Sequence, residues 1–154
     1  MKSFIALLFI LSALCCSTKP DLEKERAAIV SLLNIERKAH FEENVDLFMS
    51  EFSNNMVAVN KGTVTIDGTE KTRKRIQDYF DKVEFIKWDD VVPPKISFSN
   101  DATMAYAIVE KQVILSIKDR LQPALLDTTD FAWVTIYRKI GNQWKVECNV
   151  STNK

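Results

Sequence analysis

The chain has 154 residues, of which 46% are hydrophobic and 27% are charged, and its 21 Lys and Arg residues equal its 21 Asp and Glu residues in number. This length and apolar fraction suit one domain built around a single core. Without a basic excess or a basic run with interleaved aromatic residues, nucleic acid is not an expected partner.

The first segment is a short apolar run behind one positive charge. Lys2 precedes residues 4–16, which are interrupted only by Ser12. This pattern is typical of a secretory signal, and it is shorter than the roughly 20 apolar residues of a transmembrane helix. The alternative, a buried core helix, is disfavoured because the run has no polar face. We therefore expect a signal segment at 1–16, a tether at 17–20 and one domain at 21–154.

Two cysteines close that run. Residues 11–13 (Leu-Ser-Ala) followed by Cys15 and Cys16 resemble a bacterial lipoprotein signal, although Leu14 interrupts the usual spacing. The pattern predicts lipidation of Cys15 or Cys16, with ordinary cleavage as the alternative. The protein would then be exported, either periplasmic or held on the membrane of a bacterial cell envelope by that lipid alone. Cys148 is left without a disulfide partner, and its strand-like neighbours favour a small buried residue.

The domain begins with predicted helices. Pro20 and Asp21 are start signals for a helix over Asp21–His40, which contains neither Gly nor Pro. Its apolar residues fall on one face, and they are Ala28, Ile29, Leu32, Leu33, Ile35 and Ala39. Glu36 lies inside this face and His40 one turn beyond it. A second helix is predicted over Phe41–Phe52.

A hairpin and a third helix follow. Met56–Val59 and Thr63–Ile66 flank a turn that contains Gly62, which predicts two paired strands. Thr69 is a suitable cap for a helix that runs through Val83.

The rest of the chain predicts strands. They are expected over Phe85–Trp88, Lys95–Ser99, Thr103–Ile117, Thr128–Lys139 and Gln143–Ser151. Asp89 and Asp90 predict a solvated turn after the first of them. Long strands joined by short turns, behind a helical first half, predict an α+β fold in which three N-terminal helices pack on one face of a curved antiparallel sheet.

Alternation assigns faces to two of these strands. In the first long strand, Ala105, Ala107, Val109, Val113 and Leu115 form the better core face. Tyr106 is a candidate ligand-binding aromatic residue, but this alternation puts it on the outer surface of the sheet. In the next strand, Phe131, Trp133, Thr135 and Tyr137 share one side, either as packing or as part of a ligand cage.

The order of these elements resembles the nuclear transport factor 2-like superfamily, and the local sequence resembles its exported SnoaL-like, DUF4440-type branch. The residues that carry the resemblance are 36–40, 57–62, 75–80, 88–90, 104–106, 131–133, 141–146 and 151–152. It covers the whole mature chain. It implies a cone-shaped, cystatin-like sheet over a long first helix, an enclosed pocket and a homodimer formed through the sheet. Asn44, Asn55, Cys148 and Val150 stand where many relatives have Asp or His.

Glu36 and His40 are the candidate catalytic residues. A carboxyl group in an apolar helix face should lose hydration, which raises its pKa and suits it to general acid–base chemistry. The alternative is a buried Glu that is hydrogen-bonded for structural reasons. His40 is the only histidine, which excludes a His-rich zinc site. It could share a cavity with Glu36 or cap carbonyl groups at the helix end.

The remaining motifs indicate no cofactor and no metal, because the sequence has no Gly-rich phosphate loop, paired-Cys motif or nucleophile elbow. Our first hypothesis is a non-catalytic exported domain that binds a small, largely apolar molecule or self-associates. The alternative is a SnoaL-like isomerase, cyclase or hydratase that uses Glu36 and His40 for proton transfer. The candidate ligand-binding residues are Glu36, His40, Trp88, Tyr106 and Trp133.

Overall fold

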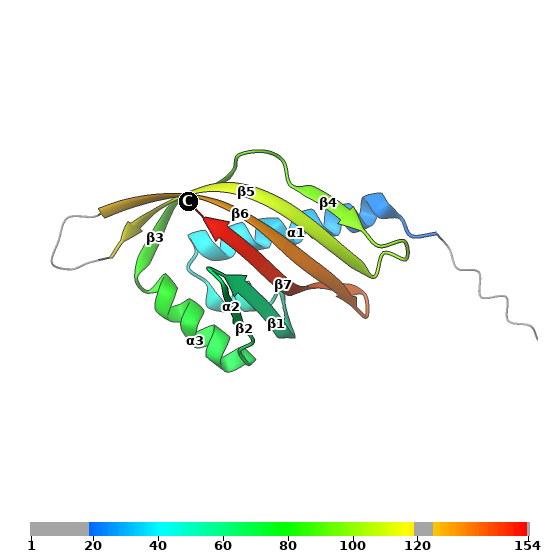
Figure 1. The fold of residues 1–154 in the computed structure, drawn as a ribbon, viewed down its shortest axis with the longest axis horizontal. Coiled ribbons are helices and arrows are strands. Elements are labelled where there is room, and N and C mark those ends of the chain that lie inside the picture. Colours follow the sequence, from blue (N-terminus) through cyan, green and yellow to red (C-terminus); the bar gives the residue numbers. More distant parts are fainter. Residues whose placement is uncertain (1–18, 119–124, 154) are drawn as a thin grey trace, which may run out of the picture.

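The computed structural model describes residues 19–118 and 125–153 (Figure 1). The predicted signal segment, with Cys15 and Cys16, lies outside these residues, as does the first half of the predicted tether. Within the two described ranges, no helix is both long enough and apolar enough to cross a membrane.

Three helices precede most of the sheet, and they are α1 (Leu22–Phe41), α2 (Val45–Met49) and α3 (Thr69–Phe80). The side chain of Asp21 caps α1 by accepting a hydrogen bond from the Lys24 N–H, as its sequence position indicates. The predicted second helix is too long. The side chain of Asn44 caps a helix that ends at Met49.

The third helix also differs from its prediction at both ends. Gly68 occupies the cap position, and Thr69 is already helical. The helix ends at Phe80 because Val83 starts a strand whose first residue pairs with Ile117. Tertiary pairing therefore overrides the helical spacing of Val83.

The sheet has seven strands. They are β1 (Phe52–Asn60), β2 (Thr63–Thr65), β3 (Val83–Asp90), β4 (Lys95–Phe98), β5 (Met104–Ile117), β6 (Leu125–Ile140) and β7 (Gln143–Asn153). Their order is β2-β1-β7-β6-β5-β3, and β4 pairs with β5. The predicted turn at Asp89 and Asp90 is instead the end of β3, where these residues pair with Gln112 and Lys111.

One strand pair departs from the predicted antiparallel sheet. β1 and β7 are parallel, whereas the other pairs are antiparallel. Most of the domain separates β1 from β7 in the sequence, so no short turn imposes an antiparallel direction on them. The result is a curved, mixed sheet that arches over the helices (Figure 1).

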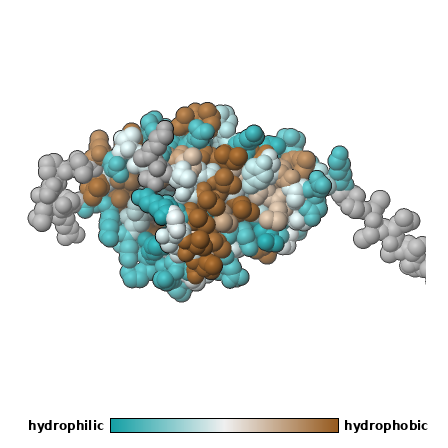
Figure 2. Space-filling view, in the orientation of Figure 1, coloured by the Kyte–Doolittle hydropathy of each residue, from teal (hydrophilic) through white to brown (hydrophobic). Residues whose placement is uncertain are grey.

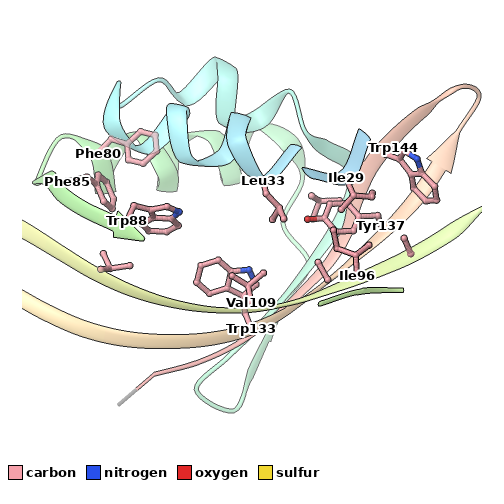
Figure 3. Close-up of a cluster of buried hydrophobic side chains, with 14 of the residues drawn as sticks. Ile29, Leu33, Phe80, Phe85, Trp88, Ile96, Val109, Trp133, Tyr137 and Trp144 are labelled. Atoms are coloured by element: carbon pink, nitrogen blue, oxygen red, sulfur yellow. The ribbon is translucent and has the colours of Figure 1, made fainter. Parts of the chain in front are cut away.

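The two faces of the sheet follow the predicted alternation. On β5, Ala105, Ala107, Val109 and Val113 are buried, whereas Tyr106 is 41% exposed. Figure 2 shows apolar residues gathered over the strands in the middle of the viewed face. The inner face packs against the helices through the buried apolar cluster, part of which is drawn in Figure 3.

The N-terminal half of α1 is fastened to the sheet by paired polar groups. Lys139 Nζ lies 2.5 Å from Glu25 Oε1, and Trp144 Nε1 donates to Glu25 Oε2 at 2.7 Å. Arg26 donates to the carbonyl oxygen of Ile96 at 3.2 Å. The hydrogen bond from Lys139 lowers the pKa of Glu25. We call this part of the molecule, around Ile29 and Trp144, the closed end.

Candidate functional site

A cavity of about 460 Å³ lies beside the C-terminal half of α1. Its lining comes from α1, α2, α3, β1, β2, β3, β6 and β7, so elements from the whole domain meet there. Apolar side chains such as Leu32, Phe48 and Ile76 make up much of the wall. The volume lies in the range of roughly 300–1,000 Å³ that is usual for small-molecule sites. We call this region the cavity end.

Two carboxyl groups face this cavity. Glu36 projects from α1, and Glu51, which is 3% exposed, lies in the turn between α2 and β1. Burial raises the pKa of Glu36 to about 7, although the charge of Lys111 opposes the shift. Burial and then the charge of Glu36 raise the pKa of Glu51 to about 9. At neutral pH, Glu51 is therefore protonated and Glu36 is close to half protonated.

His40 is a neutral member of the site. Its Nδ1 lies 2.7 Å from the carbonyl oxygen of Glu36. Because a carbonyl oxygen only accepts, Nδ1 carries the proton and Nε2 is left as an acceptor. The imidazole stacks on Trp88 with ring centroids 3.8 Å apart. Burial lowers the pKa of His40 to about 4, so the ring stays uncharged at neutral pH.

Two tryptophans provide hydrogen-bond donors. Trp88 and Trp133 line the cavity, and their ring centroids are 5.8 Å apart (Figure 3). Their Nε1 atoms are buried and have no hydrogen-bond partner among the described residues, as is also true of Glu51 Oε1. An indole N–H can only donate, and a protonated carboxyl group can also donate. The cavity is thus bordered by buried polar atoms that no described residue satisfies.

An ion pair with one buried partner lies behind this wall. Lys111 on β5 is 3% exposed and pairs with Asp90 on β3. Its Nζ is 6.0 Å from the ring centroid of Trp133. The pair places a compensated positive charge near Glu36 without adding a free charge to the cavity wall.

The structure brings together four of the five residues that the sequence suggested for ligand binding, namely Glu36, His40, Trp88 and Trp133. Tyr106 is not among the lining residues. It lies on the outer face of the sheet, so it does not contribute to the cavity as the ligand-binding prediction required. The arrangement of Glu36 and His40 follows from their spacing of one helical turn.

Glu51 was missed by sequence reasoning. The predicted second helix absorbed it as one more helical residue, but α2 ends at Met49 and the chain turns Glu51 inward. In the sequence, Glu51 is an acidic residue between Met49 and Phe52, and these neighbours do not distinguish it from a surface carboxylate.

No protein-family model and no curated protein matches this sequence. Solved structures do match its fold. A ketosteroid isomerase-like protein from Erwinia carotovora atroseptica has a TM-score of 0.67 at 13% identity, covering 84% of this chain and 96% of its own. A type 2 hexachlorocyclohexane dehydrochlorinase has a TM-score of 0.70 at 14% identity, covering 88% and 90%.

A third solved structure, a nuclear transport factor 2-like protein of unknown function from Shewanella baltica, has a TM-score of 0.62 at 13% identity, covering 89% of this chain and 98% of its own. The helices, the curved open sheet and the cavity between them therefore define an α+β cone. It is the nuclear transport factor 2-like fold, as the sequence resemblance implied. Because proteins with this fold differ in activity, the fold does not decide what this chain does.

Proposed function

We propose that the cavity binds a small, largely apolar molecule that carries a hydrogen-bond acceptor such as a carbonyl oxygen. The observation that carries this proposal is a set of buried polar atoms beside an apolar cavity that have no partner among the described residues: Glu51 Oε1, Trp88 Nε1 and Trp133 Nε1. A buried polar group without a partner costs about 1–3 kcal/mol. A ligand oxygen near these donors would remove part of that cost.

The protonation states of the lining residues indicate which polar group the ligand carries. The two indole groups only donate, and the raised pKa of Glu51 keeps its carboxyl group protonated at neutral pH. An acceptor therefore suits this wall better than a second donor. The aromatic and aliphatic side chains around it would cover the apolar body of the ligand.

The test compares molecules of one shape with and without the acceptor. A cyclic ketone and the corresponding hydrocarbon are added to the purified protein, and the melting temperature is measured. At 100 times its dissociation constant, a ligand adds about 2.7 kcal/mol, a rise of about 10 °C for a domain of this size. Trp133→Phe should reduce the ketone effect, whereas Trp144→Phe should not. Equal shifts for ketone and hydrocarbon would show that the donors do not select the ligand.

Proton transfer is a second candidate function, because one cavity holds two carboxyl groups with separated pKa values, about 7 for Glu36 and about 9 for Glu51. Such a pair offers a base and a neutral donor at the same pH. Glu36 would remove a proton from the carbon next to the carbonyl group. Glu51 and the indole N–H groups would stabilise the negative charge that develops on the oxygen. An isomerase, a cyclase or a hydratase could use this step.

This candidate is tested by following exchange of the α-hydrogens of a bound ketone for deuterium by NMR. Glu36→Gln should abolish exchange and retain binding, because the amide keeps the shape of the side chain. Asp89→Asn, at an exposed position on β3, is the matched control and should exchange normally. Binding without exchange in the unmodified protein would leave only the binding function.

We further propose a homodimer through the outer face of the sheet. Tyr106, Ile108 and Val150 are 41%, 39% and 37% exposed there. Ile108 pairs with Val134, which pairs with Val150, so the apolar residues run across three strands. Sedimentation at several concentrations should detect the dimer, and Ile108→Glu should give a monomer.

Export, with lipidation at Cys15 or Cys16, remains our proposal for location. It rests on the apolar run at residues 4–16 and the two cysteines that close it. Cell fractionation of the protein and of a Cys15→Ser, Cys16→Ser variant tests it. Loss of membrane association in the variant is expected, and an unchanged distribution would refute lipidation.

A further inference from the structure

The cavity reaches α3, where its lining residues Arg75 and Tyr79 are exposed. Arg75 and Tyr79 line the cavity, and both also line a second hollow of about 430 Å³ on the outer side of that helix. The two hollows are therefore adjacent, with these two side chains between them. A ligand in the cavity could therefore extend past Arg75 and Tyr79 onto the surface of α3.

This second hollow is mostly basic. Its lining comprises Lys71, Lys74, Arg75, Asp78, Tyr79 and Lys82. Their spacing places those within α3 on one side of the helix. Hydrophilic residues cover the part of the surface where α3 lies (Figures 1 and 2).

The positive charges there exceed the negative ones. Asp78 pairs with Lys74, and Asp67 pairs with Lys71 and, at 3.9 Å, with Arg75. Lys82 forms no salt bridge within the described parts of the chain. Burial and then the charge of Asp127 raise the pKa of Tyr79, so Asp127 also acts near this opening.

The interior of the cavity offers no comparable place for an anion. Glu36 and Glu51 supply no positive charge, and His40 is neutral. Lys111 is paired with Asp90 behind the wall. An anionic group moved into this interior would lose its hydration without gaining a counter-charge. A charged end of a ligand would therefore remain at the opening.

We propose that the ligand is an amphipathic carboxylate, whose apolar part occupies the cavity and whose carboxylate lies against Arg75 and the lysines of α3. This inference rests on the proposed binding function. Arg75 suits the role because a guanidinium group can bind a carboxylate through two parallel hydrogen bonds. Its 3.9 Å contact with Asp67 is too long for a hydrogen bond, which leaves its donors available to a ligand.

Calorimetric titration with decanoate and with methyl decanoate tests the proposal, because the ester keeps the apolar chain and loses the charge. Decanoate should bind the full-length protein at least about tenfold more tightly at low salt, a difference of about 1.4 kcal/mol. The difference should shrink as the salt concentration rises. An Arg75→Gln, Lys82→Gln variant should lose most of this preference for the acid over the ester. Lys38→Gln, an exposed position on α1, is the control.

The outcomes separate the two proposals. Equal affinities for acid and ester would overturn the carboxylate assignment and leave the cavity as an apolar ligand site. Failure of both to bind, together with failure of the ketones, would refute the binding function itself. Binding of acetate as tight as that of decanoate would show a surface anion site independent of the cavity, which also contradicts this inference.

Discussion

The two ends of α1 pack against the same sheet, but the pKa values of the carboxyl groups at these ends shift in opposite directions. At the closed end, Glu25 has two hydrogen-bond partners, Lys139 and Trp144, and its pKa is lowered. At the cavity end, the pKa values of Glu36 and Glu51 are raised, and Glu51 Oε1 has no partner among the described residues. One helix therefore carries both a stabilised carboxylate and a destabilised one.

The two ends of α1 therefore contribute differently to the stability of the domain. A paired charge at the closed end stabilises the folded state and fixes the start of α1 on the sheet. Partnerless polar groups destabilise the folded state, and they are usually found where a ligand or a reaction uses them. The cavity end is thus the part of the domain where buried polar groups reduce stability.

The largest expected contrast comes from truncating apolar side chains at the two ends. Ile29 is 0% exposed at the closed end, so Ile29→Ala should lower the free energy of unfolding by about 2–5 kcal/mol. Leu32 lines the cavity, where one side already lacks packing partners, so Leu32→Ala should cost about half as much or less. Urea unfolding of both variants measures the difference. Equal losses would mean that the cavity end is packed as tightly as the closed end.

The pH dependence of stability should differ in sign between the ends. Above about pH 4.5 the unfolded chain loses the proton that the folded state keeps on Glu36, so the free energy of unfolding falls until about pH 7. The shift corresponds to at most about 3 kcal/mol, since part of the side chain faces the cavity. Glu51 extends the fall to about pH 9. Glu36→Gln and Glu51→Gln should flatten this decline in unfolding titrations between pH 5 and 9.

Glu25→Gln is the matched variant at the closed end. The lowered pKa of Glu25 contributes stability above its unfolded pKa, and this contribution is lost as the pH falls through the lowered value. The variant should therefore be less stable than the unmodified protein at neutral pH and similar to it in acid. If Glu51→Gln were less stable than the unmodified protein at pH 9, the folded state would not be raising the pKa of Glu51.

The sequence predicts some features of the cavity end and not others. Helical spacing predicted that Glu36 and His40 share a cavity, because residues one turn apart on one helix face meet the same neighbours. The position of Glu51 depends on where α2 stops, and the pairing of Lys111 with Asp90 depends on the register between β5 and β3. Such features arise from contacts between distant parts of the chain, which local spacing does not encode. For the same reason, the parallel pairing of β1 with β7 was not predicted.

The smallest contrast concerns single indole N–H groups. Trp144→Phe removes a donor that binds Glu25 at 2.7 Å, and hydrogen bonds to charged groups contribute about 1.5–3 kcal/mol. Trp88→Phe and Trp133→Phe remove donors that have no partner among the described residues. The loss of ring area is similar in all three variants, so these two should cost less by about 2 kcal/mol. Chemical unfolding of the three variants measures this. Adding a bound ketone should narrow this difference by about 1 kcal/mol, because the donors of Trp88 and Trp133 then have a partner to lose. A difference that the ligand leaves unchanged would mean that these indole groups serve packing alone.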